Sequence, residues 1–366
     1  MTVATVLDAL HRIAPPELAE PWDNVGLLLG DPAAPCTRAL VALDADAALL
    51  RRAAASRAQL LISHHPPLFT PLRRLTPADA AGRLLLDAAR RGIALAAAHT
   101  NYDAAAGGVN DVLAGLLGLC ATEPLAPRSR AQAKLVVFVP PGDVAPVLRA
   151  LDENGAGVIG QYRQCSFRTP GTGTFLPLEG ARPTLGQVGR REEAAELRIE
   201  AIVPQPLARR AAAAVRAAHS YEEPAIDIYP LENPESPIGL GRCGQLPRAV
   251  RADRFVRTVK DRLRLERVRV AGDLRRRVER VAVCGGSGGD YVEDAIRQGC
   301  QLYVTGDVKH HQALAAAASG LVVVDAGHAA TEAPAIPVLA RRLAELCPGV
   351  RFTPIPVPPD GPFRLA

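Results

Sequence analysis

Residues 59–67 read Gln-Leu-Leu-Ile-Ser-His-His-Pro-Pro, an apolar run that stops at two histidines and two prolines. Leu60 to Ile62 has the length and character of a buried strand. Pro66 disfavours helical geometry for His65, so the chain should leave the strand extended. Successive side chains on an extended backbone point opposite ways, so two adjacent histidines reach one metal badly and two neighbouring metals well. We interpret the pair as one ligand for each ion of a dinuclear centre; the alternative is two polar residues at a strand end.

Length and composition set broad limits on the protein. The 366 residues suggest two domains, or three, and 48% hydrophobic residues provide a sizeable core. The net charge of +5 could attract a phosphorylated ligand, but we prefer to explain it by arginines spread over solvated faces. No basic block interleaves with aromatic residues, so a nucleic-acid surface is not indicated.

The cysteine pattern and the N-terminus bear on location. The seven cysteines include no CxxC pair, which argues against a disulfide framework or a thiolate zinc site and favours a reduced, cytoplasmic protein. Residues 1–16 carry charges within an apolar pattern, which is typical of an amphipathic helix and not of a signal peptide. No uninterrupted apolar run is long enough to span a bilayer.

Strands and helices alternate in the two outer segments, residues 1–127 and 238–366. This alternation predicts one α/β domain made of two related halves, with a largely parallel sheet whose faces are covered. Asp44 is the expected N-cap of an Ala-rich helix, and Thr76 is expected to open the next helix. The expected strands are 39–43, 60–62, 93–98, 268–271, 280–283, 302–305 and 321–325, with an edge strand at 351–355; the helices are 2–13, 76–91, 109–119, 289–298 and 308–318.

The composition and the order of expected strands and helices change between about residues 128 and 237. Strands at 134–139, 197–203 and 225–231, helices at 144–154 and 207–219, and a Gly/Thr-rich stretch at 161–177 follow one another here. The order β-α-β, then β-α-β is the ferredoxin-like pattern. A Pro-rich exit ends at Pro237, so we interpret residues 128–237 as an inserted α+β domain.

Potential metal ligands follow several of the outer strands. Because ligands gather at the carboxyl ends of strands in such sheets, these residues are expected to converge. His328 and Glu332 share a face if the chain turns helical there. Three imidazoles and two carboxylates suit a pair of zinc, iron, manganese or cobalt ions, although Asp103 could cap a turn, Glu332 could be solvated and His328 could fill a gap. The candidate ligands are His64, His65, Asp103, His328 and Glu332.

Several motifs also resemble those of the NIF-three-like dinuclear metal-centre family, often labelled GTP cyclohydrolase 1 type 2 homologs. They are Asp23-Asn-Val-Gly26, Ser63-His-His-Pro66, His99-Thr-Asn-Tyr-Asp103, Thr305-Gly-Asp307 with His311, and Asp325-Ala-Gly-His328 with Glu332. Residues 161–175 and 219–225 resemble the insert of the long bacterial members, which is similar to PII and CutA-type domains. The resemblance implies the same five ligands, two divalent ions per subunit, and a toroidal homohexamer with the sites facing an inner cavity.

The resemblance implies a metal-dependent hydrolase acting on a nucleotide or related heterocycle. A metal-bound hydroxide would attack C8 of the guanine ring of GTP, with loss of formate. The alternative is a non-catalytic assembly that binds or delivers metal, or docks partners. His99 could shuttle protons or merely orient Asp103, and His311 could contact substrate or lie on a helix surface.

A glycine-rich run, Cys284-Gly-Gly-Ser-Gly-Gly-Asp290, lies between an expected strand and an expected helix. Its backbone amides could cradle a phosphate. The alternative is a tight turn that needs glycine for its backbone conformation.

Overall fold

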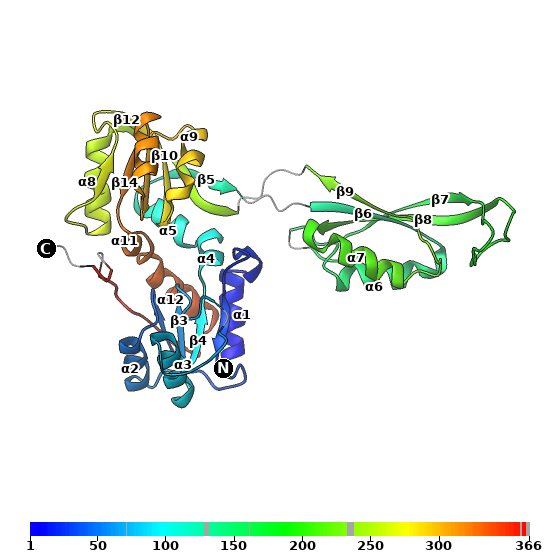
Figure 1. The fold of residues 1–366 in the computed structure, drawn as a ribbon, viewed down its shortest axis with the longest axis horizontal. Helices are drawn as coiled ribbons and strands as arrows, with labels where there is room; N and C mark the ends of the chain where they lie inside the picture. The colour runs from blue at the N-terminus through cyan, green and yellow to red at the C-terminus, as the bar shows by residue number, and fades with distance from the viewer. Residues whose placement is uncertain (71, 128–131, 161, 233–237, 359–360, 364–366) are drawn as a thin grey trace. The chain divides into compact units, whose positions relative to one another are not determined.

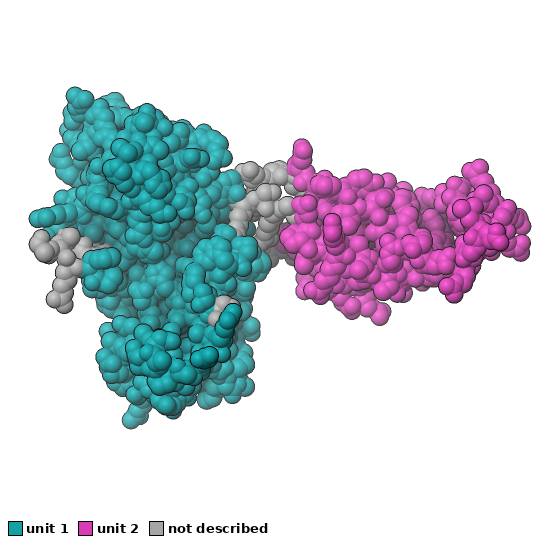
Figure 2. Space-filling view, in the orientation of Figure 1, with its two compact units in different colours: residues 1–128, 237–366 teal, residues 129–236 magenta. Residues whose placement is uncertain are grey.

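The computed structural model describes the whole chain except residues 71, 128–131, 161, 233–237, 359–360 and 364–366. The chain forms two compact units, one of residues 1–128 with 237–366 and one of residues 129–236 (Figure 2). The expected insert boundaries at 128 and 237, and Gln161 at the start of its Gly/Thr-rich stretch, lie outside the described residues.

The first sheet of the larger unit has the order β1-β4-β3-β2-β15 (Figure 1). Four strands are parallel, and β1 pairs with β4 in the antiparallel sense. Alternate strand residues face opposite helix pairs: Leu60 and Ile62 pack with α1 and α12, and Leu61 packs with α2 and α3. The elements are β1 (Gly26–Leu29), β2 (Arg38–Ala42), β3 (Leu60–Ser63), β4 (Ala94–Ala97), β15 (Arg351–Pro354), α1 (Val3–Ile13), α2 (Ala47–Ala55), α3 (Ala80–Arg90) and α12 (Ala335–Leu346).

The second sheet has the order β11-β14-β13-β12-β10-β5. Only β12, β13 and β14 run parallel, and the other three pairings are antiparallel. The expectation of a largely parallel sheet is therefore right for the first sheet and wrong for the second. Its elements are β5 (Cys120–Pro127), β10 (Gly239–Arg251), β11 (Arg269–Ala271), β12 (Arg277–Ser287), β13 (Leu302–Gly306), β14 (Val322–Asp325), α5 (Val109–Leu116), α8 (Ala252–Leu263), α9 (Val292–Arg297) and α10 (His310–Ala318).

The two outer segments of the chain exchange strands. β5 comes from the N-terminal segment but lies at the edge of the second sheet, and β15 comes from the C-terminal segment but lies at the edge of the first. Each sheet is therefore completed by the other segment. Short helices α4 (Thr100–Ala104) and α11 (His328–Glu332), with the 3-10 turns η1 (Pro16–Leu18) and η3 (Gly289–Tyr291), complete this unit.

Two expected helix starts are wrong for the same reason. The side chain of Asp46 accepts a hydrogen bond from the Leu49 amide at 2.6 Å and begins α2, so Asp44 is not the cap. The side chain of Asp79 likewise accepts from the Gly82 amide at 2.7 Å, so α3 begins after Asp79 and not at Thr76. In both places a second residue with capping chemistry lies a few positions downstream.

The smaller unit is one antiparallel sheet of order β7-β8-β6-β9 with α6 and α7 packed on it (Figure 1). Alternate residues of β6, such as Leu135 and Val137, join the core beneath the helices. Along the chain the order is β-α-β-β-α-β. The elements are β6 (Gln132–Val139), η2 (Pro141–Asp143), α6 (Val144–Glu153), β7 (Phe167–Phe175), β8 (Glu192–Pro204), α7 (Gln205–Ala217) and β9 (Ile226–Leu231).

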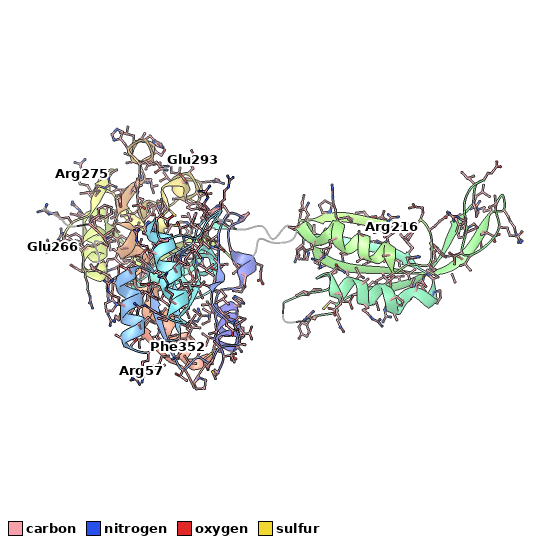
Figure 3. The ribbon with its side chains drawn as sticks, turned by 60° about the horizontal axis from the view of Figure 1, so that its bottom comes forward. Arg57, Arg216, Glu266, Arg275, Glu293 and Phe352 are labelled. Atoms are coloured by element: carbon pink, nitrogen blue, oxygen red, sulfur yellow. The ribbon has the colours of Figure 1, made fainter. Side chains whose placement is uncertain are left out.

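The surface carries much of the chain's arginine. Arg57, Arg216 and Arg275 are exposed, and Figure 3 shows Arg57 and Arg275 near the edge of the larger unit. This favours solvated faces as the explanation of the net positive charge. No helix among the described residues has the length and apolar character needed to span a membrane.

Candidate metal centre

The five candidate ligands come from three places that the fold brings together in the larger unit. His64 and His65 directly follow β3, Asp103 lies on α4 just beyond β4, and α11 after β14 carries His328 and Glu332. Thr331 of α11 accepts a hydrogen bond from the Gly286 amide of β12 at 2.9 Å, which holds α11 against the second sheet. His64, Asp103 and Glu332 are buried, whereas the side chains of His65 and His328 are 25% and 35% exposed.

The ligand atoms form two groups that share one carboxylate. His64, Asp103 and Glu332 make the first group, and His65, His328 and Glu332 make the second. In the first group His64 Nε2 lies 3.5 Å from Asp103 Oδ1 and 3.7 Å from Glu332 Oε1. In the second, Glu332 Oε2 lies 3.1 Å from His65 Nε2 and 3.2 Å from His328 Nε2. The two groups that contain Glu332 thus separate the adjacent histidines, and Glu332 offers one oxygen to each group; a third possible group joins both histidines with His99.

The outer nitrogen of each histidine is held by an oxygen. Nδ1 of His64 lies 2.8 Å from the Ala98 carbonyl, that of His65 2.8 Å from Asp44 Oδ1, and that of His328 2.7 Å from Asp307 Oδ2. Carbonyl and carboxylate oxygens only accept, so each Nδ1 must donate. Neutral imidazole then carries its lone pair on Nε2, which all three rings direct into the cluster. This outer hydrogen bonding is the arrangement that orients metal-binding histidines.

Several inward-facing atoms have no hydrogen-bond partner among the described residues: His64 Nε2, Asp103 Oδ1 and Glu332 Oε2. Such buried polar atoms are costly unless something satisfies them. With Nδ1 already donating, neutral His65 and His328 have no hydrogen to give Glu332 across their short contacts. Cations bound by the Nε2 lone pairs and the carboxylate oxygens would satisfy every one of these atoms. The donor set therefore fits metal binding.

In the protein without metal, burial and the contacts within the cluster shift the pKa values of its histidines and carboxylates. Burial lowers the pKa of His65, but hydrogen bonds with Asp44 and Glu332 outweigh it and raise the pKa to about 10. The hydrogen bond with Glu332 likewise raises the pKa of His328 to about 9. Burial raises the pKa of Asp103 to about 6, whereas the pKa of Glu332 is low despite burial because three histidines surround it. Protons on the imidazoles therefore occupy the place that metal ions would take.

The glycine-rich run does not form a free loop. β12 continues to Ser287, and Gly285 and Gly286 lie against the cluster. A Cβ on Gly286 would come 2.1 Å from Glu332 Oε1 and 3.3 Å from His328 Nε2. The backbone of Gly286 also has φ +66°, in the left-handed region that favours glycine. Glycine is needed here so that the strand can approach Glu332, which supports the alternative to a phosphate cradle.

His99 extends the cluster on one side. Its Nδ1 lies 2.9 Å from Asp23 Oδ1, and its other nitrogen can join a group with His64 and His65. The Thr100 amide donates to Asp23 at 3.0 Å. Burial raises the pKa of Asp23, but hydrogen bonds from His99 and Thr100 prevail and lower it to about 2. His99 is therefore held by an ionised carboxylate, with its second nitrogen directed at the site.

His311 is not brought into the cluster. It lies exposed on the first turn of α10, next to exposed His310 and Lys309. None of the three groups of potential metal ligands found among the described residues includes His311. This placement matches the helix-surface alternative considered from the sequence.

The role of the Asp44, Asp307 and Asp23 carboxylates in supporting the histidines was not predicted from the sequence, although Asp44 was expected to cap a helix and the other two lie in the motifs quoted above. Asp44 and Asp307 each follow a strand closely, as the ligands do, and that position was the available signal. Asp307 also has φ +55°, an unusual conformation for a non-glycine residue. Its strained backbone accompanies its role in holding His328.

Comparison with known proteins places these features in context. A sequence model of the family Duf34/NIF3 (NGG1p interacting factor 3) matches residues 1–360. A "GTP cyclohydrolase 1 type 2 homolog" of Halalkalibacterium halodurans is 41% identical over 88% of this chain and 87% of its own length. One from Bacillus subtilis with the same name is 39% identical over 95% and 93%. The crystal structure of a Bacillus cereus protein related to NIF3 aligns over 100% of this chain and 99% of its own, with 37% identity and a TM-score of 0.74.

Proposed function

The chain belongs to the Duf34/NIF3 family, and from that premise we propose that it binds two divalent metal ions and acts as a metal-dependent hydrolase. The observation that carries the proposal is the orientation of three imidazoles, each donating Nδ1–H outwards and directing Nε2 into one cluster. We assign one ion to His64, Asp103 and Glu332 and the other to His65, His328 and Glu332. Zinc, iron, manganese and cobalt all suit this donor set.

The chemistry would take place where the two groups meet. When bound, the ions would supply Lewis acidity and lower the pKa of water towards neutrality. Glu332 would link the two groups because its one carboxylate offers an oxygen to each of them. Asp23 would hold His99 so that its Nε2 can accept a proton at the site. We keep His311 as a candidate substrate contact, although its exposed position gives it no partner in the cluster.

We propose a nucleotide or related heterocycle as the substrate, with GTP as the first candidate. Support comes from the names of relatives that are about 40% identical to the chain. We also propose a cytoplasmic homohexamer, as the family resemblance implies. The smaller unit would be an inserted PII/CutA-like domain, which its β-α-β-β-α-β order supports.

The test is ring opening of GTP by metal-loaded protein, measured as formate release and pterin fluorescence. We expect slow, metal-dependent formate release that chelation and His64→Ala abolish. Metal-loaded protein that releases no formate would eliminate GTP as the substrate. If it also leaves other nucleotides and pterin precursors intact, the chain is better described as a metal-binding or metal-delivery scaffold.

A further inference from the structure

Two large aromatic side chains stand exposed beside the metal centre. Trp22 is the only tryptophan of the chain, and 57% of its surface is exposed. Phe69 is 48% exposed, and its ring centroid lies 5.5 Å from that of Trp22 with an interplanar angle of 39°. Single exposed apolar residues are common, but a contiguous aromatic pair in a chain with only 4% aromatic residues needs an explanation.

Hydrogen bonds fix the backbone on which both rings are carried. Asn24 Nδ2 donates to the Leu68 carbonyl at 2.7 Å, which joins the segment after Trp22 to the segment before Phe69. Asp23, next to Trp22, is held by His99 and Thr100. The two rings are therefore presented side by side by the fold.

The His99 ring is close both to the aromatic pair and to two histidines of the metal centre. The His99 ring lies 6.1 Å from Trp22 and 6.1 Å from Phe69, edge-on to both. The same ring lies 5.3 Å from His64 and 5.5 Å from His65. A group resting on the exposed rings is thus a neighbour of His99, and His99 is a neighbour of both ligand groups.

We propose that Trp22 and Phe69 form a stacking platform for the planar heterocycle of the substrate, an inference that rests on the proposed function. Base-on-aromatic stacking suits any flat π-system and requires no specific hydrogen bond from the platform itself. Polar contacts come from the adjacent His99, which meets the rings at their edge and can hydrogen-bond a ring nitrogen or carbonyl. An aliphatic ligand would gain apolar contact with the aromatic faces but would leave the second ring nitrogen of His99 without a hydrogen-bond partner.

The competing occupant of the platform is a second copy of the chain. Quenching of Trp22 fluorescence separates the two, because the chain has no other tryptophan. We expect iodide to quench the emission of the full-length protein without ligand, as it would a half-exposed indole. Emission that iodide cannot reach at any protein concentration would mean that another copy covers the platform, and would overturn the proposal.

Binding is then measured on protein loaded with zinc, a closed-shell ion. Guanosine should quench Trp22 saturably and protect it from iodide, whereas ribose 5-phosphate should do neither. Phe69→Ala should raise the Kd for guanosine about five- to hundredfold, the range that alanine substitution gives for one stacked base. Phe167→Ala, which removes another exposed phenylalanine (67% exposed, against 48% for Phe69) from the smaller unit, is the control and should leave the Kd unchanged.

Calorimetry with two Trp22 variants separates stacking from simple apolar contact. Trp22→Phe keeps an aromatic face and should bind guanosine within about threefold of the parent, whereas Trp22→Leu should lose at least about fivefold. An equal loss of guanosine affinity in Trp22→Phe and Trp22→Leu would refute the platform. Unchanged affinity in Trp22→Leu and Phe69→Ala would refute it as well. Metal content is measured on every sample. Guanosine binding by a protein that retains no metal after zinc loading would leave the platform standing while the dinuclear proposal fails.

Discussion

Replacing Gly286 by alanine should abolish metal binding with little loss of fold stability. The new Cβ would lie 2.1 Å from Glu332 Oε1. Because non-bonded contacts are optimal near 3.5 Å, the carboxylate must move by about 1.4 Å. Metal–ligand distances tolerate only about 0.2 Å, and Glu332 serves both groups, so neither ion should remain in place.

The stability cost can be worked from the backbone. An L-residue at φ +66° costs about 1–2 kcal/mol, and alanine recovers about 0.4–1 kcal/mol by restricting the unfolded chain. The net loss is about 1 kcal/mol, since the clash is with the end of a side chain that can turn away. A loss of this size lowers the melting temperature by about 2–4 °C.

Gly92→Ala provides the matched control. Gly92 has φ +65°, and apart from its chain neighbours no atom of the described residues lies within 4 Å of the position that a Cβ would take. It lies in the turn after α3, so its substitution adds the same backbone strain away from the cluster. Thermal unfolding of the metal-free proteins should shift by about the same amount in the two variants, because bound metal would stabilise only the control. Elemental analysis should find metal in Gly92→Ala and at least about a hundredfold weaker metal binding in Gly286→Ala. A Gly286→Ala protein that holds metal as tightly as the control would refute this account of the glycine.

Three further predictions follow from the site and the fold. In metal-free protein the pKa values of His65 and His328 are raised from 6.5 to about 10 and about 9, so their stabilisation is complete below pH 6.5 and is lost as the pH rises to about 10. The melting temperature of metal-free protein should fall as the pH rises from 6.5 to about 10, and metal loading should remove this pH dependence. A melting temperature of metal-free protein that does not change with pH would count against the charge assignment. Asp307→Asn should weaken metal binding about 10- to 100-fold in competition with a chelator, and unchanged affinity would remove Asp307 from the site. Replacing residues 129–236 by a short linker should leave a folded core that binds metal, and an insoluble or metal-free product would show that the units depend on each other.

The convergence of the candidate ligands was predictable because their positions follow from local rules. His64 and His65 end an apolar strand, and alternation on an extended backbone separates them into different groups. His328 and Glu332 meet because residues four apart share a helical face, and Pro337 falls in the first turn of the separate helix α12. Each of these inferences needs only a few neighbouring residues.

The second sheet was harder to predict because two of its strands, β5 and β10, lack the usual signals. β5 holds two prolines and is largely exposed, and β10 is interrupted by glycine and arginine, so neither gives an apolar run. Both are stabilised by pairing with each other and, for β10, with β12, which are contacts between distant parts of the chain. The close approach of Gly286 to Glu332 is likewise a tertiary contact. Because the sequence does not reveal this contact, its glycine-rich run suggested a phosphate cradle instead.

We propose that Glu332 joins two metal sites that share no other of the five proposed ligands. Elemental analysis of metal-loaded protein, with unfolding curves as a check on folding, tests this directly. We predict two ions per chain in the parent, about one in His65→Ala and in Asp103→Ala, and none in Glu332→Ala. Undiminished metal in Glu332→Ala, or equal loss in all three variants while the fold is intact, would contradict the shared-carboxylate arrangement.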